Sequence, residues 1–292
     1  MNSPQTRLRL RFLTIAVDEE FFTVVRKGMN DAAAAMQVEA DLAGTPGVEA
    51  GELVRLTRKA IADGVHGIAL NICDADAFAE VIAEAKAHSV PVVAFNIDAA
   101  RGKSGNLSSI MQDFRGAGEA LGRRASVAIP NGANVIVTVH DDGVSALEER
   151  LGGIQAGLKD HAINWQRLCT GQDPGKGAQL LRGAIARFPV QAILGTGQAD
   201  TEACGLAARS LAPSQPFVAG FDLSPGIVDL IAQGYIDCTI DQQPYAQGFY
   251  PVVQLALYLR YGLLPSSLDA GAAFIDRFNL EAIQKLGRQS IR

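Results

Sequence analysis

The chain is predicted to be an α/β protein with two doubly wound parallel sheets, each in a Rossmann-like domain. Short runs rich in Val, Ile and Leu alternate with longer amphipathic stretches from one end of the sequence to the other. Continuous apolar strands separated by helices indicate parallel pairing, with helices on both faces of the sheet. The 292 residues suffice for two domains of roughly 100–200 residues each, and the alternation starts again after residue 110.

The first half of the chain opens with the run RFLTIAV (Arg11–Val17), which has the composition of a buried strand. A helix over Glu49–Asp63 is expected to end at Gly64, because glycine readily adopts the left-handed conformation that closes helices. The full expectation for this half is strands at 11–17, 38–42, 67–71, 92–95 and 107–110, with helices at 22–36, 49–63 and 75–88.

The second half repeats the pattern. Pro174 stands at a favoured first-turn position of a helix, and the segment 130–132 (PNG) turns the chain. We expect helices at 114–129, 147–159, 174–188, 199–211, 225–233 and 245–260, and strands at 134–139, 165–170, 192–196, 217–221, 238–241 and near 274–278.

The division into domains follows from this repeat. Because no Pro/Gly/Ser-rich linker separates the halves, the domains are expected to share several hinge crossovers. One domain is expected over residues 1–110 plus 242–272, and the other over 111–241 plus 273–292.

Composition excludes several classes of protein. With 31 acidic and 26 basic residues the net charge is −5, and no basic cluster marks a nucleic-acid-binding face. No apolar run approaches the roughly 20 residues that cross a bilayer. The four cysteines are too scattered for a disulfide framework or a metal site, and we expect them to be buried core residues.

The residues that follow the predicted strands are mostly planar amides and carboxylates. Ligands of open parallel sheets bind beyond the carboxyl ends of the strands, so these residues are candidates for a binding site. Phe21 and Phe22 follow the first strand and are expected to be exposed just before a helix. Amides, carboxylates and aromatic faces together suit the hydroxyl edges and C–H faces of sugars and polyols. Capping of the following helices explains each polar residue equally well when it is taken alone.

Several motifs then occur in a fixed order: Glu20-Phe21-Phe22 with Gly28, IADGVHGIALN at 61–71, VPVVAFNID at 90–98, Gln112-Asp113 with Gly116 and Gly118, AGFD at 219–222 and TIDQQPYAQG at 239–248. With these motifs the chain resembles the type I periplasmic solute-binding proteins of sugar ABC transporters, the ribose-binding-like family. That family shares its fold with the inducer-binding domain of LacI-type repressors. The resemblance covers nearly the whole chain and implies the type I periplasmic binding protein fold.

The resemblance also implies ligand contacts. Phe21 and Phe22 would stack on the sugar ring, Asn71 would bond hydroxyls, and Arg150 would clamp hydroxyls with its fork of donors. Together with the other residues that follow the strands, the expected ligand-binding set is Glu19, Phe21, Phe22, Asn71, Asn96, Asp98, His140, Arg150, Gln172, Gln198, Asp222 and Gln242. No catalytic residue, metal ligand or cofactor is expected.

The sequence departs from the family's pattern at several of these positions. Asn96 and Ile97 stand where ribose-binding relatives have Asp and Arg, and Asp98 is a candidate replacement for one of those charges. Gly197 occupies the place of a family Asn, and Gln172 replaces an aromatic wall residue. These changes favour altered specificity, for a pentose, a branched sugar or a small polyol.

The function implied is that of a receptor that binds a monosaccharide in the cleft between its domains, closes, and delivers the sugar to the membrane permease of an ABC transporter. A chemoreceptor is a compatible second partner, nucleic acid is not expected, and the chain is expected to be a monomer. The resemblance implies a periplasmic protein from which a signal peptide has been removed. The N-terminus itself shows no signal-peptide pattern, so a cytoplasmic protein that starts at Met1 stays open.

Two other function classes remain as alternatives. A LacI-type regulator carries a helix-turn-helix of about 50–60 residues before the first strand, whereas only about ten residues precede Phe12, so the alternative is the effector-binding core of such a regulator. A sugar-processing enzyme is less favoured. His140 beside Asp141 and Asp142 could act as a base, but no matching nucleophile or metal-binding spacing accompanies it.

Overall fold

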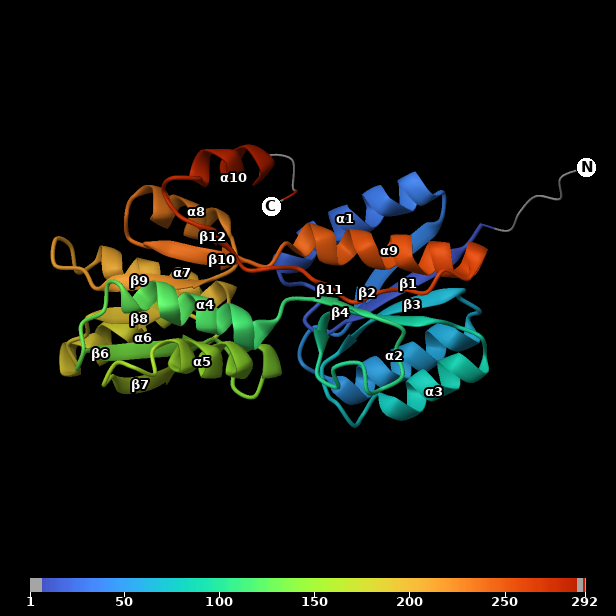
Figure 1. Ribbon diagram of the computed structural model, residues 1–292, viewed down its shortest axis with the longest axis horizontal. Coiled ribbons are helices and arrows are strands. Elements are labelled where there is room, and N and C mark those ends of the chain that lie inside the picture. The colour runs from blue at the N-terminus through green and yellow to red at the C-terminus, as the bar shows by residue number, and fades with distance from the viewer. Residues whose placement is uncertain (1–6, 288–290, 292) are drawn as a thin grey trace, which may run out of the picture. The chain divides into compact units, whose positions relative to one another are not determined.

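The computed structural model describes residues 7–287 and 291. Its contacts divide the chain into two units (Figure 1): unit 1 holds the described residues up to 111 together with 243–270, and unit 2 holds 112–242 together with 271–287. The junctions at 111/112, 242/243 and 270/271 lie within two residues of the expected 110/111, 241/242 and 272/273.

Unit 1 is a parallel sheet with two helices on each face. Its strand order is β11-β5-β4-β3-β1-β2, and every pairing is parallel. Helices α1 and α9 cover one face, and α2 and α3 cover the other (Figure 1). The strands are β1 (Arg9–Thr14), β2 (Glu39–Gly44), β3 (Gly67–Ile72), β4 (Val92–Asp98), β5 (Ser109–Met111) and β11 (Leu268–Asp269), and the helices are α1 (Phe21–Met36), α2 (Ala50–Ala62), α3 (Ala79–Ala87) and α9 (Pro244–Tyr261).

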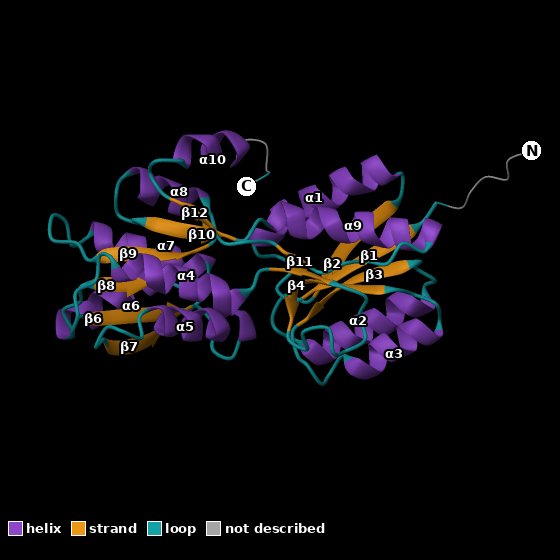
Figure 2. Ribbon diagram, in the orientation of Figure 1, coloured by secondary structure: helices purple, strands orange, loops and turns teal. Residues whose placement is uncertain are grey.

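Unit 2 repeats this arrangement with the order β12-β10-β9-β8-β6-β7, in which only β12 runs antiparallel to its neighbour in the described chain. Strands again form the central layer between helices (Figure 2). The strands are β6 (Asn134–Val139), β7 (Asn164–Cys169), β8 (Ala192–Leu194), β9 (Phe217–Phe221), β10 (Cys238–Asp241) and β12 (Ala273–Ile275), and the helices are α4 (Phe114–Ser126), α5 (Ser145–Gly157), α6 (Pro174–Arg187), α7 (Gln198–Arg209), α8 (Pro225–Ala232) and α10 (Leu280–Gly287).

The predicted class, two doubly wound α/β units, is confirmed, and most elements lie where the sequence predicts them. The helix expected from residue 75 begins only at Ala79, because Asp74 Oδ1 accepts from the backbone N–H groups of Asp76 and Ala77 and forms a turn there. The short strand β11 and helix α10 were not predicted. Cys204 and Cys238 are buried as expected, but Cys73 is only partly buried and Cys169 is exposed on the edge strand β7, so the expectation of four buried cysteines is wrong for these two.

Glycines let one pair of helices in each unit approach closely. A Cβ on Gly28 of α1 would lie 2.1 Å from the carbonyl oxygen of Tyr245, and one on Gly248 of α9 would lie 1.9 Å from that of Val25. In unit 2, Gly118 of α4 meets the backbone of Arg150 on α5 in the same way, at 2.3 Å. Any larger residue would push these helices apart, so the glycines fix α9 on unit 1 and place Arg150 in unit 2.

Candidate functional site

Each sheet reverses its winding direction at one point, which is where open α/β sheets bind ligands. In unit 1 this point lies between β1 and β3, and in unit 2 between β6 and β8. The predicted site residues of each unit should therefore meet near the carboxyl ends of these strands.

In unit 1 a bulge in β4 sets the direction of Asn96. The register runs from Leu70 opposite Ala94 to Ile72 opposite Asp98, so β4 holds two extra residues across this step. Asn96 lies within the bulge with φ of +63°, a left-handed conformation that Asn adopts more readily than most residues. Bulges re-aim side chains, and this one directs Asn96 toward Asn71 on the neighbouring strand.

Asn96 and Asn71 belong to a buried chain of polar side chains. Asn71 Nδ2 donates to Asn96 Oδ1 at 2.9 Å and to Thr14 Oγ1 at 3.3 Å. Asn96 Nδ2 in turn donates to Gln247 Oε1 at 3.3 Å. These bonds fix the orientation of the Asn71 amide. Its Oδ1 atom is buried and has no hydrogen-bond partner in the described part of the chain, so it is an oriented acceptor that lacks a donor.

The two phenylalanines at the start of α1 have different surroundings. Phe22 is only 3% exposed and packs in the core of unit 1, so the expectation that both rings are exposed is wrong for it. Phe21 is partly exposed, with its ring edge-to-face against Phe22 at 5.1 Å. Phe21 is therefore the better placed of the two to meet a sugar ring. Glu19, just before the helix, is exposed.

Asp98 faces its own loop. Its Oδ2 atom accepts from the backbone N–H of Gly102 at 2.9 Å, from Asn106 Nδ2 at 3.2 Å and from the hydroxyl of Ser109. Although Asp98 lies in the same strand as Asn96, these bonds make it the organiser of the β4–β5 loop. A ligand-binding role for Asp98 stays a prediction.

In unit 2 the centre of the site is Arg150, which is 2% exposed. Its Nε and Nη2 atoms donate to Gln112 Oε1 at 3.1 and 2.9 Å, and Nη1 donates to the carbonyl of Thr196 at 2.9 Å. Nη1 also lies 3.5 Å from Asp222 Oδ2. In the residues described here, these contacts use four of the five guanidinium N–H groups, which leaves one Nη2–H as a donor.

The surroundings hold Arg150 firmly. Its guanidinium lies over the ring of Phe221, 4.3 Å from the centroid, and 5.1 Å from that of Phe114. Burial lowers the pKa of Arg150, while the charge of Asp222 opposes that shift. Asp222 has φ of +70°, and its Oδ1 accepts from Gln242 Nε2 at 2.6 Å. Arg150, Asp222 and Gln242, predicted from different parts of the sequence, thus form one network.

A second polar group in unit 2 joins His140 to Asp200. His140 Nδ1 lies 2.9 Å from Asp200 Oδ1, and the fully buried Asp200 also accepts from Thr138 Oγ1 and from the N–H groups of Thr196 and Gly197. An ionised carboxylate only accepts, so the His140 Nδ1 atom carries the proton and Nε2 is an acceptor when the ring is neutral.

The ring of His140 occupies the space beside Gly197. A Cβ on Gly197 would lie 2.4 Å from His140 Cε1. At the position where the resemblance leads one to expect Asn, this chain therefore has glycine with an imidazole ring beside it. Gln198, which follows, is partly exposed, and Gln172 is exposed in the β7–α6 loop.

Four polar residues of these networks were not predicted as site residues: Thr14, Gln112, Asp200 and Gln247. Gln112 stands in a motif shared with the family, which is a signal that could have identified it. Gln247 lies in the motif TIDQQPYAQG at 239–248, which is a second such signal. Thr14 lies inside an apolar strand, where nothing in the local sequence marks it.

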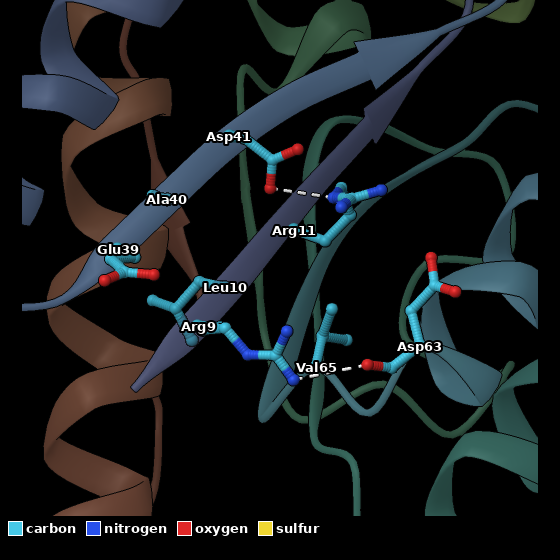
Figure 3. A pocket seen from close by; sticks show the side chains of 8 residues that line it. All are labelled: Arg9, Leu10, Arg11, Glu39, Ala40, Asp41, Asp63 and Val65. Atoms are coloured by element: carbon cyan, nitrogen blue, oxygen red, sulfur yellow. Dashed lines mark hydrogen bonds and ion pairs between the residues drawn. The ribbon is translucent and has the colours of Figure 1, made fainter. Parts of the chain in front are cut away.

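A recess of about 510 Å³ lies elsewhere, at the amino ends of β1 and β2 (Figure 3). Both of its arginines already have partners: Arg11 Nε donates to Asp41 Oδ1 at 2.7 Å, and Arg9 Nη2 donates to the carbonyl of Asp63 at 3.2 Å. The recess is therefore a less suitable ligand site than the strand ends. Over the described residues, no group of three His, Cys, Asp or Glu is placed to hold a metal, and no helix has the length and apolarity to cross a bilayer.

Known proteins share this architecture over most of its length. Xylose/arabinose-binding protein XylF of Sulfolobus acidocaldarius is 26% identical over 290 residues, which cover 94% of this chain and 72% of the relative. The structure of a carbohydrate transporter from Acidothermus cellulolyticus 11B in complex with myo-inositol matches with a TM-score of 0.86 and 27% identity, covering 98% of this chain and all of that one. An ABC sugar transporter (periplasmic sugar binding protein) from Legionella pneumophila matches with a TM-score of 0.84 and 26% identity, covering 91% of this chain and all of that one.

The family described as "Periplasmic binding protein domain" matches residues 12–262, which include β1 through α9 and so most of both sheets. Its members are solute-binding proteins, and those of ABC transporters work in the periplasm or another extracytoplasmic space. The match spans well over half of the chain, and the chain therefore belongs to the periplasmic binding protein family, as a solute receptor of the sugar-transporter type.

Proposed function

We propose that the chain binds a small polyhydroxylated solute, either a monosaccharide such as a pentose or a cyclic polyol, and that it passes this solute to an ABC permease. The observation that carries the proposal is the buried, oriented and unpartnered Oδ1 of Asn71 in unit 1. A hydroxyl group can donate to it, whereas an apolar solute or an anion cannot. One relative named above is a xylose/arabinose-binding protein and another is a structure in complex with myo-inositol, and all three solutes carry hydroxyl groups that fit this requirement.

Unit 2 supports the same class of solute. Arg150 keeps one Nη2–H, which can donate to the oxygen of a ligand hydroxyl. Joint binding of one ligand by both units is implied by the resemblance and stays a prediction. Small-angle X-ray scattering would test it, since a ligand held by both units should lower the radius of gyration.

The first experiment is a thermal-shift screen of pentoses, hexoses, branched sugars and polyols, followed by calorimetric titration of each hit. A ligand at about 100 times its Kd stabilises the folded state by about 2.7 kcal/mol, which raises the melting temperature visibly. The matched variants are Asn71→Leu and Asn164→Leu, the latter at an exposed cross-strand Asn pair in unit 2. We expect the first to weaken binding about 5- to 150-fold, the equivalent of an unsatisfied buried group at about 1–3 kcal/mol, and the second to leave it unchanged.

The outcomes separate the alternatives. A hit whose affinity depends on Asn71 supports the proposal. A monomeric receptor that acts in the periplasm is proposed on the family resemblance alone. No response to any sugar or polyol, with a response to phosphorylated sugars, would contradict it and would favour the effector-binding core of a regulator. Turnover of a bound sugar would instead favour an enzyme.

A further inference from the structure

Gln112 binds the guanidinium of Arg150 along one whole edge. It is the first residue of unit 2, between β5 and α4, and its side chain is completely buried. Its Oε1 atom accepts from Arg150 Nε at 3.1 Å and from Nη2 at 2.9 Å. Such an edge is what arginine uses to form two-bond forks with carboxylates and phosphates. In this chain a neutral amide oxygen occupies it instead.

The direction of the Gln112 amide is fixed by a second contact. Its Nε2 atom donates to the backbone carbonyl of Gly271 at 2.7 Å. Turning the amide over would set its oxygen against that carbonyl and its NH2 group against the N–H groups of Arg150, so acceptor would meet acceptor and donor would meet donor. Gly271 belongs to the same unit, so unit 2 itself holds the amide oxygen toward Arg150.

Arg150 is thereby held at two edges. On the other side, Nη1 donates to the carbonyl of Thr196 at 2.9 Å and lies 3.5 Å from Asp222 Oδ2. Because the guanidinium is planar, acceptors at two of its edges fix its plane and its rotation, and with them the direction of the remaining Nη2–H. Without Gln112, two buried N–H groups would lose their acceptor and the guanidinium would be free to turn toward others.

The charges around Arg150 explain why an amide suits this place. Two carboxylates, Asp222 and Asp200, already stabilise the charged form of Arg150. A neutral acceptor completes the hydrogen bonds without burying a further negative charge. We propose that Gln112 is a positioning residue of the solute site, which holds Arg150 so that it offers one fixed N–H donor to a solute hydroxyl. The inference rests on the proposed function, in which Arg150 donates to the solute.

Three substitutions separate positioning from the filling of space. Gln112→Met keeps the length of the side chain but removes the acceptor, and Gln112→Glu keeps an acceptor for both N–H groups while it loses the donor to Gly271. Gln254→Met is the matched control in unit 1. The Gln254 amide likewise donates to a carbonyl, that of Ser266, and accepts from a side chain, the hydroxyl of Ser108.

Hydrogen exchange of the arginine side chains tests the positioning without any solute. Among the arginines that the structure describes, Arg150 is the only buried one, so one Nε–H signal in ¹H–¹⁵N spectra of the full chain should exchange slowly. Gln112→Met should speed this exchange about tenfold or more, the equivalent of losing a hydrogen bond to a charged group. Gln112→Glu and Gln254→Met should leave it slow, although the added buried charge of Gln112→Glu should lower the melting temperature.

Calorimetric titration tests the consequence for binding. The probes are D-ribose, D-glucose and the compound of the thermal-shift panel with the largest shift. For a probe that binds the parent chain, Gln112→Met should raise the Kd about 10- to 150-fold, because the solute loses a well-oriented hydrogen bond to a charged group. Gln112→Glu should keep most of the affinity, and Gln254→Met all of it.

Unchanged slow exchange in Gln112→Met, or fast exchange of every arginine in the parent chain, would overturn the proposal. Fast exchange in Gln112→Glu as well would contradict it, because the role of Gln112 would then lie in its bond to Gly271. Fast exchange in Gln112→Met with an unchanged Kd would contradict it too, since the orientation of Arg150 would not matter to the solute.

The two experiments also separate this inference from the proposed function. If no probe binds the parent chain, the proposed function fails, and the exchange experiment still decides whether Gln112 holds Arg150. Should Gln112→Met not fold, Gln112→Asn takes its place, because its shorter side chain withdraws the amide oxygen from Arg150 and should speed the exchange in the same way.

Discussion

The two units share one strand order and differ in the chemistry at the point where the winding reverses. Unit 1 lines that point with neutral amides, and one of them, Asn71, keeps an oxygen without a partner. Unit 2 places a buried guanidinium there, Arg150, and surrounds it with three acceptors and two aromatic rings. One unit thus presents a spare acceptor and the other a spare donor.

The difference follows from what each group costs to bury. An unpaired neutral amide oxygen costs about 1–3 kcal/mol, which a folded unit can tolerate until a ligand arrives. An unpaired buried charge costs several kcal/mol more, so a cation in the same position needs a full set of partners before any ligand binds. Unit 2 should therefore depend on its site residues for stability far more than unit 1 does.

Replacing Arg150 gives the largest expected effect. Arg150→Met leaves Asp222 without its cation and Gln112 without its donors, and removing one partner of a buried pair lowers the free energy of unfolding by about 3–5 kcal/mol. Urea denaturation followed by Trp165 fluorescence measures this, because Trp165 is the only tryptophan and lies on β7 of unit 2. Arg167→Met is the control: its ion pairs with Asp142 and Glu148 are exposed, and it should cost at most about 1 kcal/mol. Equal losses in the two variants would contradict the comparison.

Replacing Asn71 should have a smaller effect on stability. Asn71→Leu leaves Asn96 Oδ1 without its donor but buries no charge, so the free energy of unfolding should fall by about 1–3 kcal/mol. Urea denaturation followed by far-UV circular dichroism is the measurement, with Asn164→Leu expected to change it by about 0.5 kcal/mol or less. A loss as large as that of Arg150→Met would show that the amide chain of unit 1 is as essential as the charge network of unit 2.

The contact between Gly197 and His140 offers a sharper test of unit 2. Gly197→Ala places a methyl group against the imidazole ring, and overpacking of this kind costs about 1–3 kcal/mol unless the ring moves. His140→Ala in the same chain should restore most of the loss, so a double-mutant cycle should show strong coupling. The control is Gly183→Ala on α6, where an added Cβ meets no atom within 4 Å. This substitution should stabilise the protein by up to about 1 kcal/mol, because alanine favours the helix more than glycine does. Additive effects of Gly197→Ala and His140→Ala would rule out the contact.

The smallest expected effect lies away from both sites, on α9 of unit 1. Burial and the hydrogen bond from the Tyr245 hydroxyl to Asp31 raise the pKa of Tyr245 to about 12. A raised pKa means that the folded state favours the neutral phenol of Tyr245. The stability that Tyr245 contributes is therefore complete below about pH 10 and is lost as the pH rises toward 12. Absorbance titration of the tyrosines should show one late ionisation, absent in Tyr245→Phe and retained in Tyr250→Phe. A titration without a late step in the parent chain would show that the hydrogen bond does not persist in solution.

Much of this architecture could be predicted from the sequence, because buried parallel strands read as uninterrupted apolar runs. Strands β6, β9 and β10 begin and end where the sequence predicts them. The sequence also nominated Asn71, Asn96, Arg150, Asp222 and Gln242, because they follow strands or stand in motifs shared with the family. The structure places them in two polar networks, and their ligand-binding role stays a prediction.

The contacts of those residues could not be predicted in the same way. The bulge that turns Asn96 toward Asn71 depends on strand register, which no local pattern specifies. Gln247 joins the hydrogen-bonded side chains of Asn71 and Asn96 from a helix about 150 residues further along the sequence, so only the tertiary fold brings it there. Phe22 lies in the core because α1 packs on the sheet with that side inward, whereas an adjacent Phe pair alone does not show which ring faces solvent.

The reciprocal glycines that hold α9 on α1 have a consequence for synthesis in the cell. Unit 1 takes its last helix from residues 244–261, after the chain has already passed through unit 2. A ribosome that has completed β5 at residue 111 must add about 150 more residues before that helix exists, which takes roughly 8–30 s at 5–20 residues per second. Throughout that interval α1 alone covers this face of the first sheet, and the nascent protein exposes the apolar surface that α9 later buries, which chaperones can recognise.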